Sequence, residues 1–562
     1  MKSSGHLSLG AIAMGWFTRT PGIHAMPLIQ ALPRLCSQDS VTIARNVSSD
    51  WPWQEYISSS ARPPYLEINA TGEELAPGLI LFDPQTGINS ESYIPDKAPF
   101  IMTDAGDLVW SGPVIPDASN FRVQKLFGQP VITYWAGSGG AAESSSASHG
   151  YGHIVIHNSS YDQIGVFCPK LNLTLPPGTS APCQADVHES LITEDNTILI
   201  TAYNTTNADL RDLGGSEDGW VLDSLVLEID LHTSEILFSW SPLAHVPISD
   251  TKLSLDGAGA NSSDPFDFFH TNSIQPFEGN YLINSRSTWS TYLVNRSGDI
   301  IWKINGQTGG DFGSLPEGGN FSWEHFGRIQ RTSDTHLQLG YFANNNGGAT
   351  TSYPSVGLEL LLTVPPSHEH PPQLLKNLSD PLHPVVSLAM GSHDVLSNGN
   401  HFLGYGIQPV MKEFGPHNPQ GRDVRWSARY NHDDGGASYR TYKSLWKATP
   451  SSQPLLHVKR LNHTHYQTDG LNGIECGSSK IRGYVSWNGA TQVKYYILYV
   501  GNSTRSMKAV GIFPKVGFET KFAIPENKGQ SMFQVDAVED SDLGVTRRSA
   551  IMELCFGRTR FL

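Results

Sequence analysis

The chain has 562 residues, which is enough for two domains or for one large repeat domain with an appendage. Charged residues make up only 16% of it, and the 54 glycines, 36 prolines and 10% of aromatic residues favour short strands joined by turns over helical bundles. The net charge of −15 and the absence of long basic runs argue against a nucleic-acid partner, and no apolar stretch reaches the roughly 20 residues that a membrane-spanning helix needs.

Residues 1–25 have the outline of a signal peptide. Lys2 precedes an apolar stretch over residues 7–17, and small residues follow up to Ala25. A leader that stays in the cytosol is the alternative for this segment taken alone. Acceptor sites of the type Asn-X-Ser/Thr favour the secretory pathway or the extracellular space, and we expect glycans at Asn46, Asn69, Asn158, Asn172, Asn204, Asn261, Asn295, Asn320, Asn377, Asn462 and Asn502.

The five cysteines fit an oxidising compartment. Cys168 and Cys183 flank a proline-rich segment, so we predict that they close a small ring. Cys476 and Cys555 bracket the C-terminal region and are predicted to staple it. Cys36 is left over in this scheme.

A strand ending that contains tryptophan recurs along the chain. It is found at residues 105–110 (AGDLVW), 234–240 (SEILFSW), 297–302 (SGDIIW) and 421–426 (GRDVRW). Each copy is a turn followed by apolar residues, and the repeat spacing is roughly 40–60 residues. This pattern predicts an all-β fold, with a β-propeller over residues 40–450 whose strand ends converge on a central channel. An irregular pair of β-sandwiches is the alternative.

Beyond residue 450 the pattern fades, and residues 484–487 and 494–500 alternate like antiparallel strands. We therefore expect residues 451–562 to form a small β-sandwich-like region that packs on the propeller. The segment 137–149 contains a serine run and is predicted to be a mobile loop.

The sequence has neither the Gly-X-Ser-X-Gly elbow of serine esterases nor the His-Glu-X-X-His helix of zinc proteases. Four polar residues instead stand at predicted strand ends amid apolar neighbours, where a propeller would build an axial site. These candidates are His188, His270, Arg286 and His325.

From about residue 79 to residue 543 the chain resembles the arylsulfotransferase-like proteins, in particular a branch common in fungi. The motifs that carry the resemblance are 106–111 (GDLVWS), 131–137 (VITYWAG), 219–224 (GWVLDS), 269–273 (FHTNS), 300–304 (IIWKI) and 486–491 (SWNGAT). The resemblance implies a six-bladed propeller with an axial pocket. It also implies transfer of a sulfuryl group from an aryl sulfate to a phenol through a sulfohistidine.

By match to the family motifs, His325 is expected to be the nucleophile, His188 and His270 auxiliary histidines, and Arg286 the arginine that binds the sulfuryl oxygens. No metal, nucleotide or other cofactor is expected. The substrate is expected to be an aromatic or polycyclic small molecule, in contact with Phe269, Asn272, Trp323 and Glu324.

One motif departs from the family. Many relatives have Gln-His-Asp around the third histidine, whereas this chain has Glu324, His325 and Phe326. A carboxylate before the histidine is expected to orient it or to raise its pKa, and the aspartate that would follow is missing. Two other functions therefore stay open: a hetero-Diels–Alderase of a fungal tropolone or sesquiterpenoid type of secondary-metabolite pathway, and a non-catalytic secreted binding protein.

Overall fold

The computed structural model describes residues 32–87, 90–139, 149–345, 353–416, 422–461, 481–524, 530–539, 545–555 and 558–561. The predicted all-β class is confirmed, because the helical segments among these residues are short 3-10 turns: Arg211–Leu213, Pro242–Ala244, Ile248–Asp250 and Gly310–Phe312. No helix in this part of the chain is long and apolar enough to cross a membrane.

Between residues 67 and 444 the strands form six antiparallel sheets of four or five strands, of which five have their four main strands in chain order. The second sheet contains β9 (Ala118–Leu126), β10 (Gln129–Gly139), β11 (Gly150–His157) and β12 (Gln163–Phe167). The third contains β13 (Ser190–Ile192), β14 (Thr197–Ala208), β15 (Gly219–Asp230) and β16 (Ile236–Trp240). The fourth contains β17 (Thr271–Phe277), β18 (Asn280–Ser285), β19 (Ser290–Val294) and β20 (Ile300–Asn305).

The fifth sheet contains β21 (His325–Ser333), β22 (His336–Ala343), β23 (Val356–Thr363) and β24 (Gln373–Leu378). The sixth contains β25 (Ser392–Val395), β26 (His401–Gly404), β27 (Val410–Phe414) and β28 (Val424–Arg429), with β4 (Glu67–Ala70) added at its edge. The first sheet joins both ends of this region, because β30 (Tyr442–Ser444) pairs with β5 (Leu79–Phe82), which is followed by β7 (Phe100–Met102) and β8 (Leu108–Ser111). Two-stranded pairs are formed by β2 (Thr42–Ala44) with β3 (Trp53–Glu55) and by β6 (Gln85–Thr86) with β29 (Gly436–Ala437).

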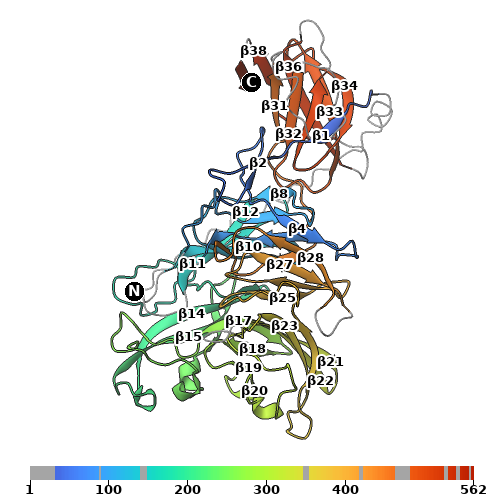
Figure 1. Cartoon of the computed structure of the whole chain (residues 1–562). Helices are drawn as coiled ribbons and strands as arrows, with labels where there is room; N and C mark the ends of the chain where they lie inside the picture. Colours follow the sequence, from blue (N-terminus) through green and yellow to red (C-terminus); the bar gives the residue numbers. More distant parts are fainter. Residues whose placement is uncertain are drawn as a thin grey trace.

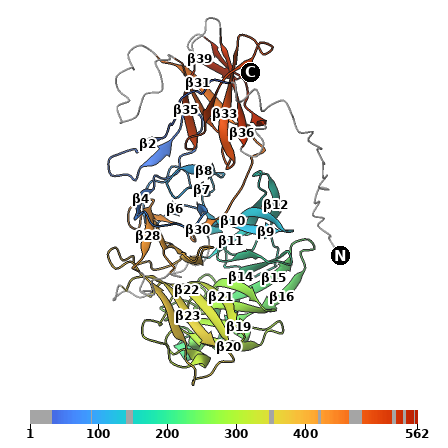
Figure 2. The ribbon, with the colours of Figure 1, turned by 90° about the vertical axis from the view of Figure 1, so that its right-hand side faces the viewer.

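Neighbouring sheets contact each other in chain order. Contacts join β9 to β13, β14 to β17, β17 to β21, β21 to β25 and β25 to β30, and β30 returns to β9. Figures 1 and 2 show the sheets following one another from blue and cyan through green and yellow to orange. Strand β14 is buried on both faces over residues 197–203, which explains why this part of it is apolar without strict alternation.

The recurring tryptophan motif marks the last main strand of four sheets. Trp110, Trp240, Trp302 and Trp426 lie on β8, β16, β20 and β28, and all four are buried. Nε1 of Trp240 donates to the carbonyl of Gly298 at 3.1 Å, and Nε1 of Trp426 donates to that of Asp104 at 2.8 Å. Each acceptor lies in or next to the turn of another copy of the motif, so the repeat also joins one sheet to the next.

A buried carboxylate ties several sheets together. Glu189, directly before β13, accepts from Arg440 at 3.0 Å, from Arg328 at 2.9 Å and from Arg122 at 3.4 Å. Arg122 lies on β9, Arg328 on β21 and Arg440 just before β30. Burial would raise the pKa of Glu189, but the three guanidinium groups hold it below its usual value. The ion cluster therefore links four of the six sheets.

The C-terminal strands form two further sheets around one core. One contains β31 (Leu455–Arg460), β32 (Ile481–Ser486), β35 (Glu519–Ile524) and β1 (Ser37–Asp39), and the other contains β34 (Lys508–Pro514), β33 (Val493–Gly501), β36 (Met532–Glu539), β37 (Val545–Arg548), β38 (Met552–Cys555) and β39 (Arg558–Phe561). Tyr496, Phe513, Phe522 and Val535 are among the residues of the shared core. The N-terminal strand β1 belongs to this unit, because it pairs with β35 at the edge of the first of these sheets. Figure 1 shows it in blue among the C-terminal strands.

Two motifs far apart in the sequence hold this unit on the first sheet. The side chain of Asn488 accepts from the N–H of Ser111 at 2.8 Å and donates to its carbonyl at 2.9 Å. The N–H of Gly489 donates to the carbonyl of Val109 at 2.8 Å. Tyr161 donates to the carbonyl of Gly489 at 3.0 Å, so the turn after β32 is fixed from both sides.

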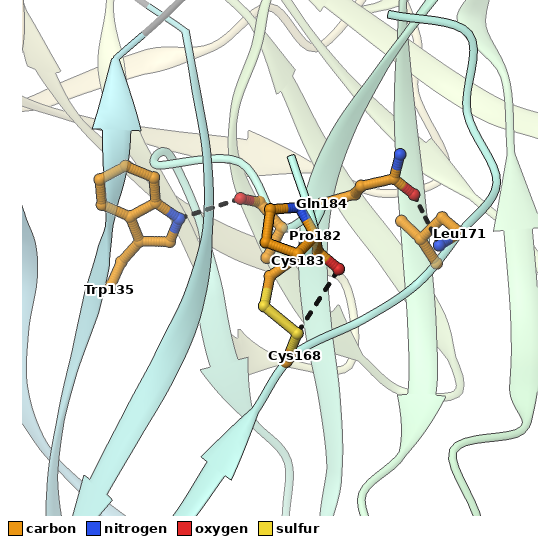
Figure 3. Close-up of a disulfide and its surroundings, with 7 residues drawn as sticks. Trp135, Cys168, Leu171, Pro182, Cys183 and Gln184 are labelled. Carbon is orange, nitrogen blue, oxygen red and sulfur yellow. Dashed lines mark hydrogen bonds between the residues drawn. A yellow bond between two sulfur atoms is a disulfide. The ribbon is translucent and has the colours of Figure 1, made fainter. Parts of the chain in front are cut away.

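The predicted bond between Cys168 and Cys183 is present (Figure 3). It closes a loop with a sequence separation of 15 after β12, worth about 3 kcal/mol in the chain-entropy picture. Next to it, Nε1 of Trp135 donates to the carbonyl of Ala185 at 2.9 Å. Cys36 is disulfide-bonded, so the expectation that it is left over is wrong. The predicted pair of Cys476 and Cys555 lies outside the described residues, since Cys476 and the side chain of Cys555 are not described.

Candidate active site

Two of the predicted site residues lie side by side. His188 stands two residues before β13 and His270 directly before β17, at corresponding ends of neighbouring sheets. Their Nε2 atoms are 3.1 Å apart, and both side chains are buried. The structure thus brings together residues that are far apart in the sequence.

Each of these histidines is held by an aspartate that precedes it closely in the sequence. Nδ1 of His188 lies 2.6 Å from Oδ2 of Asp186, and Nδ1 of His270 lies 2.5 Å from Oδ2 of Asp267. Burial would raise the pKa of both carboxyl groups, but the facing histidines hold both pKa values below the usual range. Because an ionised carboxylate only accepts, Nδ1 is the proton-bearing nitrogen of each ring.

A third histidine completes this group. Nε2 of His149 lies 2.9 Å from Oδ2 of Asp267, and its ring centroid lies 4.7 Å from that of His270. Burial opposes its protonation, but Asp267 raises its pKa overall. The expectation that the segment 137–149 is a mobile loop is wrong at both ends, because residues 137–139 belong to β10 and His149 is buried; residues 140–148 lie outside the described part.

Arg286 follows β18 and is 6% exposed. Its backbone N–H donates to the carbonyl of His270 at 3.0 Å, which fixes the start of its side chain beside the histidines. The guanidinium lies over the ring of Trp323, 4.9 Å from its centroid, and has no hydrogen-bond partner among the described residues. Burial lowers its pKa, while Asp267 and Glu324 act in the opposite direction.

Glu324 is fully buried near this arginine. Neither carboxyl oxygen has a hydrogen-bond partner in the part of the chain that the structure describes. Its backbone carbonyl accepts from the side chain of Asn272 at 2.7 Å and from that of Asn284 at 3.3 Å. Burial raises the pKa of Glu324 to about 8, so the carboxyl group is protonated at neutral pH.

His325, the first residue of β21, is buried and fixed at both ring nitrogens. Nδ1 lies 2.7 Å from Oδ1 of Asn344, and Nε2 accepts from the N–H of Met390 at 3.2 Å. Burial first, and then the charge of Arg286, hold the pKa of His325 well below its usual value. The expectation that Glu324 orients this histidine or raises its pKa is therefore wrong: Glu324 is neutral, and Asn344 does the orienting.

A tyrosine lies between the two histidine groups. The ring centroid of Tyr439 is 5.4 Å from that of His188 and 6.4 Å from that of His325. Its hydroxyl donates to the carbonyl of Asn272 at 3.3 Å. The buried groups thus form one cluster, with three histidines and two aspartates on one side and His325 on the other.

Comparison with known proteins shows to which family this chain belongs. A family model described as arylsulfotransferase (ASST) matches residues 122–426, which is more than half of the chain. The protein belongs to the arylsulfotransferase family. The matched region of this arylsulfotransferase-family chain contains all four residues predicted to be catalytic, as well as His149, Asp186 and Asp267. Tyr439 lies beyond it.

No curated protein matches this arylsulfotransferase-family chain. Among solved structures it is similar to a protein of unknown function from Bacteroides caccae, with 12% identity and a TM-score of 0.34 over 66% of this chain and 99% of that one. It is also similar to the GH43 protein BlXynB from Bacillus licheniformis, with 10% identity and a TM-score of 0.26 over 79% of this chain and 88% of that one. A third is PorZ of Porphyromonas gingivalis, with 8% identity and a TM-score of 0.26 over 93% and 81%. TM-scores this low carry no argument about fold or function.

The residues predicted to contact substrate differ in their surroundings. Phe269 lies in a hydrophobic core, 5.8 Å from the ring of Trp240 and 5.5 Å from that of Tyr292, so packing explains it. Asn272 has both groups of its amide bonded inside the protein, to Glu324 and Asn284, which makes it a positioning residue. Trp323 and Glu324 lie beside Arg286, and their contact with a substrate stays a prediction.

The sequence-based prediction missed both aspartates and one of the histidines of the cluster in this arylsulfotransferase-family protein. Asp186 and Asp267 stand two and three residues before the histidines that they hold, a spacing that was visible in the sequence. His149 gave no such signal, because it follows a serine run and reaches the site only through the pairing of β10 and β11.

Proposed function

We propose that this protein transfers a sulfuryl group from an aryl sulfate to a phenol. The supporting observation is Arg286, a buried guanidinium without a hydrogen-bond partner among the described residues. Glu324 does not neutralise it at neutral pH, because its own pKa is about 8. A buried cation with unused planar donors is suited to an anion with several oxygens, such as a sulfate ester.

His325 is the proposed nucleophile. Its depressed pKa keeps the imidazole neutral, and Asn344 fixes the proton on Nδ1, so the lone pair is on Nε2. In the first step Nε2 bonds to sulfur while the bond from sulfur to the aryl oxygen breaks, and the aryl oxygen keeps the electron pair. Attack requires Nε2 to give up the hydrogen bond from Met390.

In the second step the acceptor phenol gives its proton to His270 or His188 and bonds to sulfur, and the bond between nitrogen and sulfur returns its pair to Nε2. That proton balances the one taken up by the phenolate released in the first step. Arg286 would hold the sulfuryl oxygens, where charge accumulates, in both steps.

The mechanism is tested by incubating the protein with 4-nitrophenyl sulfate, without acceptor, and measuring intact mass and peptide mass. We expect an adduct of one sulfuryl group on His325, lost on addition of phenol. A His325→Ala variant should form none, whereas His336→Ala, at a half-buried histidine at the start of β22, should behave like the parent protein. A folded protein that forms no adduct and releases no 4-nitrophenol contradicts the mechanism.

A hetero-Diels–Alderase of a secondary-metabolite pathway is the second candidate, and the bond from Met390 to Nε2 of His325 favours it. That bond leaves the nucleophilic lone pair engaged. Pericyclic chemistry needs donors and aromatic walls rather than a nucleophile, and protonated Glu324, Arg286 and Trp323 would supply them. Accelerated cyclisation of a quinone methide with a polyene, without any adduct, would support this function.

A non-catalytic binding protein is the third possibility. It would bind an aromatic ligand but would give neither the sulfuryl adduct nor the accelerated cyclisation.

We further propose that the six sheets are the blades of a six-bladed propeller over residues 40–450, and that residues 451–562 with β1 form a sandwich-like domain packed on it. The order of sheet contacts, which returns from β30 to β9, supports the propeller.

Residues 1–25 are proposed to be a signal peptide, and the protein a secreted glycoprotein. None of the acceptor asparagines that the structure describes is buried, and Asn462 lies outside the described residues. After expression in a eukaryotic host, the protein should appear in the medium and lose mass on treatment with an endoglycosidase. Retention in the cytosol without any glycan would contradict this proposal.

A further inference from the structure

We propose that His149, His188 and His270 together bind a divalent transition-metal ion of the zinc type, each through one ring nitrogen. One nitrogen of each histidine offers a ligand atom, and these atoms all lie within 4.8 Å of one another. All three side chains are buried, with at most 3% exposed. Three imidazoles are a common protein ligand set for catalytic zinc.

The separation of two of the three donors fits a shared ion, and the third lies within 4.8 Å of both. Nε2 of His188 and Nε2 of His270 are 3.1 Å apart. Two nitrogens bound at about 2.0–2.1 Å in a tetrahedral arrangement are separated by roughly 3.3 Å. The two donor atoms therefore already have nearly the spacing that one ion imposes.

Carboxylates hold the other nitrogen of every ring. Asp186 faces Nδ1 of His188, and Asp267 faces both Nδ1 of His270 and Nε2 of His149. A carboxylate behind a histidine fixes the tautomer whose lone pair lies on the opposite nitrogen, and metal-binding histidines almost always have such a partner. Asp186 and Asp267 come from two separate segments of the chain, and together they face one nitrogen of each of the three rings. Hydrogen bonds that only stabilise the fold do not require such an arrangement.

The same contacts leave two features that need a cation. If the carboxylates accept from Nδ1 of His188 and His270, both Nε2 atoms present lone pairs to each other at 3.1 Å, and a proton or a metal ion must lie between them. In addition, Nδ1 of His149 is buried and has no hydrogen-bond partner among the described residues, and the carboxylate oxygen Oδ1 of Asp186 lies 3.8 Å from it, beyond hydrogen-bond distance. A proton between His188 and His270 would not satisfy His149, whereas a metal ion would bind all three nitrogens.

Metal binding by these histidines is a property separate from the proposed reaction, since it can be measured without any substrate. If the reaction is also as proposed, an ion held by Nε2 of His188 and His270 would leave neither nitrogen free to accept a proton, so the ion would supply the acidity of the acceptor phenol and the proton would pass to solvent. Three protein ligands leave a coordination position for that oxygen.

A second buried group serves as an internal control. His393, His401 and Glu359 also bring ligand atoms together, with Nε2 of His393 3.0 Å from Nδ1 of His401. Here Nδ1 of His393 faces the carbonyl of Tyr341, and one proton on Nδ1 of His401 satisfies the pair. This group therefore needs no metal ion, although its residue types are those of a metal site.

The test uses the full chain, stripped of metal with a chelator and titrated with Co²⁺ and then Zn²⁺. We expect one cobalt ion per chain by elemental analysis, with visible absorption typical of tetrahedral cobalt, and displacement of that absorption by zinc. Zinc should also raise the melting temperature of the stripped protein. Folded protein that retains less than a tenth of an equivalent, and shows no cobalt band, overturns the proposal in favour of a proton between the rings.

Variants identify the cluster that binds. His149→Ala, His188→Ala and His270→Ala should each abolish the cobalt band, while His401→Ala should retain it. Asp186→Asn keeps the size of the side chain and should weaken zinc binding 10–100-fold. A band lost in His401→Ala and kept in the other three would also overturn the proposal. If the alanine variants do not fold, titration of the parent protein and of Asp186→Asn decides.

Discussion

Arg286 and Glu324 form an unusual pair at the residue scale, because both side chains are buried and neither the guanidinium of Arg286 nor the protonated carboxyl group of Glu324 has a hydrogen-bond partner among the described residues. Burying an unpaired charge is costly, so such a group is retained where a ligand supplies the missing partner. With Glu324 protonated at its pKa of about 8, Asp267 is the ionised carboxylate that still acts on Arg286, and its own hydrogen bonds go to His149 and His270. This favours an anionic substrate over a neutral one.

Replacing Arg286 by methionine is expected to lower kcat/KM for aryl sulfates by about 10²–10³, the usual effect of removing one stabilising donor group from a transition state. Lysine should restore part of the loss, because it returns the charge but not the planar pair of donors. Steady-state kinetics with 4-nitrophenyl sulfate measure both. Arg331→Met, at an exposed arginine paired with Glu278, is the matched control. An Arg286→Met variant within tenfold of the parent would contradict the anion-binding role.

Glu324 predicts a dependence of stability on pH. Its folded pKa of about 8 is above the unfolded value of 4.5, so the folded state binds the extra proton between these values. The contribution of Glu324 to stability is fully present below pH 4.5 and is lost as the pH rises to 8. The advantage of Glu324→Gln over the parent in free energy of unfolding should therefore grow by several kcal/mol from pH 5 to pH 8, measured by denaturant titration. Parallel pH profiles would show that Glu324 does not titrate in this range.

How much of the site the sequence revealed depended on local signals. His188, His270, Arg286 and His325 stand at strand ends in recognisable motifs, so they could be predicted. The partners Asn344 and Met390 could not, because they approach His325 only when β22 and the segment before β25 pack beside β21. The effect of Glu324 on His325 was also misjudged, since the sequence does not show that this carboxyl group is fully buried.

At the scale of elements, one contact gives the sequence motifs at residues 106–111 and 486–491 their structural role. They lie on different units, and Asn488 joins them through two hydrogen bonds to Ser111. The repeated tryptophan motif likewise has a packing reason, because Trp240 and Trp426 each donate to the turn region of another copy. The sequence predicted the strand endings correctly, but not that they bind each other.

Asn488→Ala should destabilise this junction by about 2 kcal/mol, because it leaves the N–H and the carbonyl of Ser111 without their partner. Denaturant titration measures the loss, and hydrogen exchange should rise first in β8 and at the end of β32. Gln330→Ala removes an exposed amide that donates to Oε1 of Gln338 at 3.1 Å, and it should change stability by less than about 0.5 kcal/mol. Equal effects of the two substitutions would contradict a specific junction.

At the scale of the whole molecule, Glu189 acts on four sheets at once. Its carboxylate faces Arg122, Arg328 and Arg440, which come from distant parts of the chain. Strand β30 is the last strand of the six sheets in chain order. The cluster holds it through Arg440, and its pairing with β5 holds it against the first sheet. The sequence showed Glu189 only as the neighbour of a site histidine, because its partners are up to 251 residues away.

Glu189→Gln should lower the free energy of unfolding by about 3–5 kcal/mol, since it leaves buried guanidinium groups without their counter-charge. Thermal and denaturant unfolding measure the loss. Glu278→Gln, at an exposed ion pair with Arg331, should cost less than about 1 kcal/mol. A Glu189→Gln variant as stable as the parent would show that the arginines are compensated elsewhere.

The pairing of β30 with β5 also sets the order in which the protein can form during synthesis. Five sheets have contiguous main strands, so each can fold as it leaves the ribosome. The strand edge of β5 stays unpaired until residues 442–444 have been translated, and exposed edges of this kind recruit other chains. We therefore expect a chain truncated before residue 442 to aggregate rather than to give a smaller folded protein, because the edge of β5 that β30 covers would stay exposed.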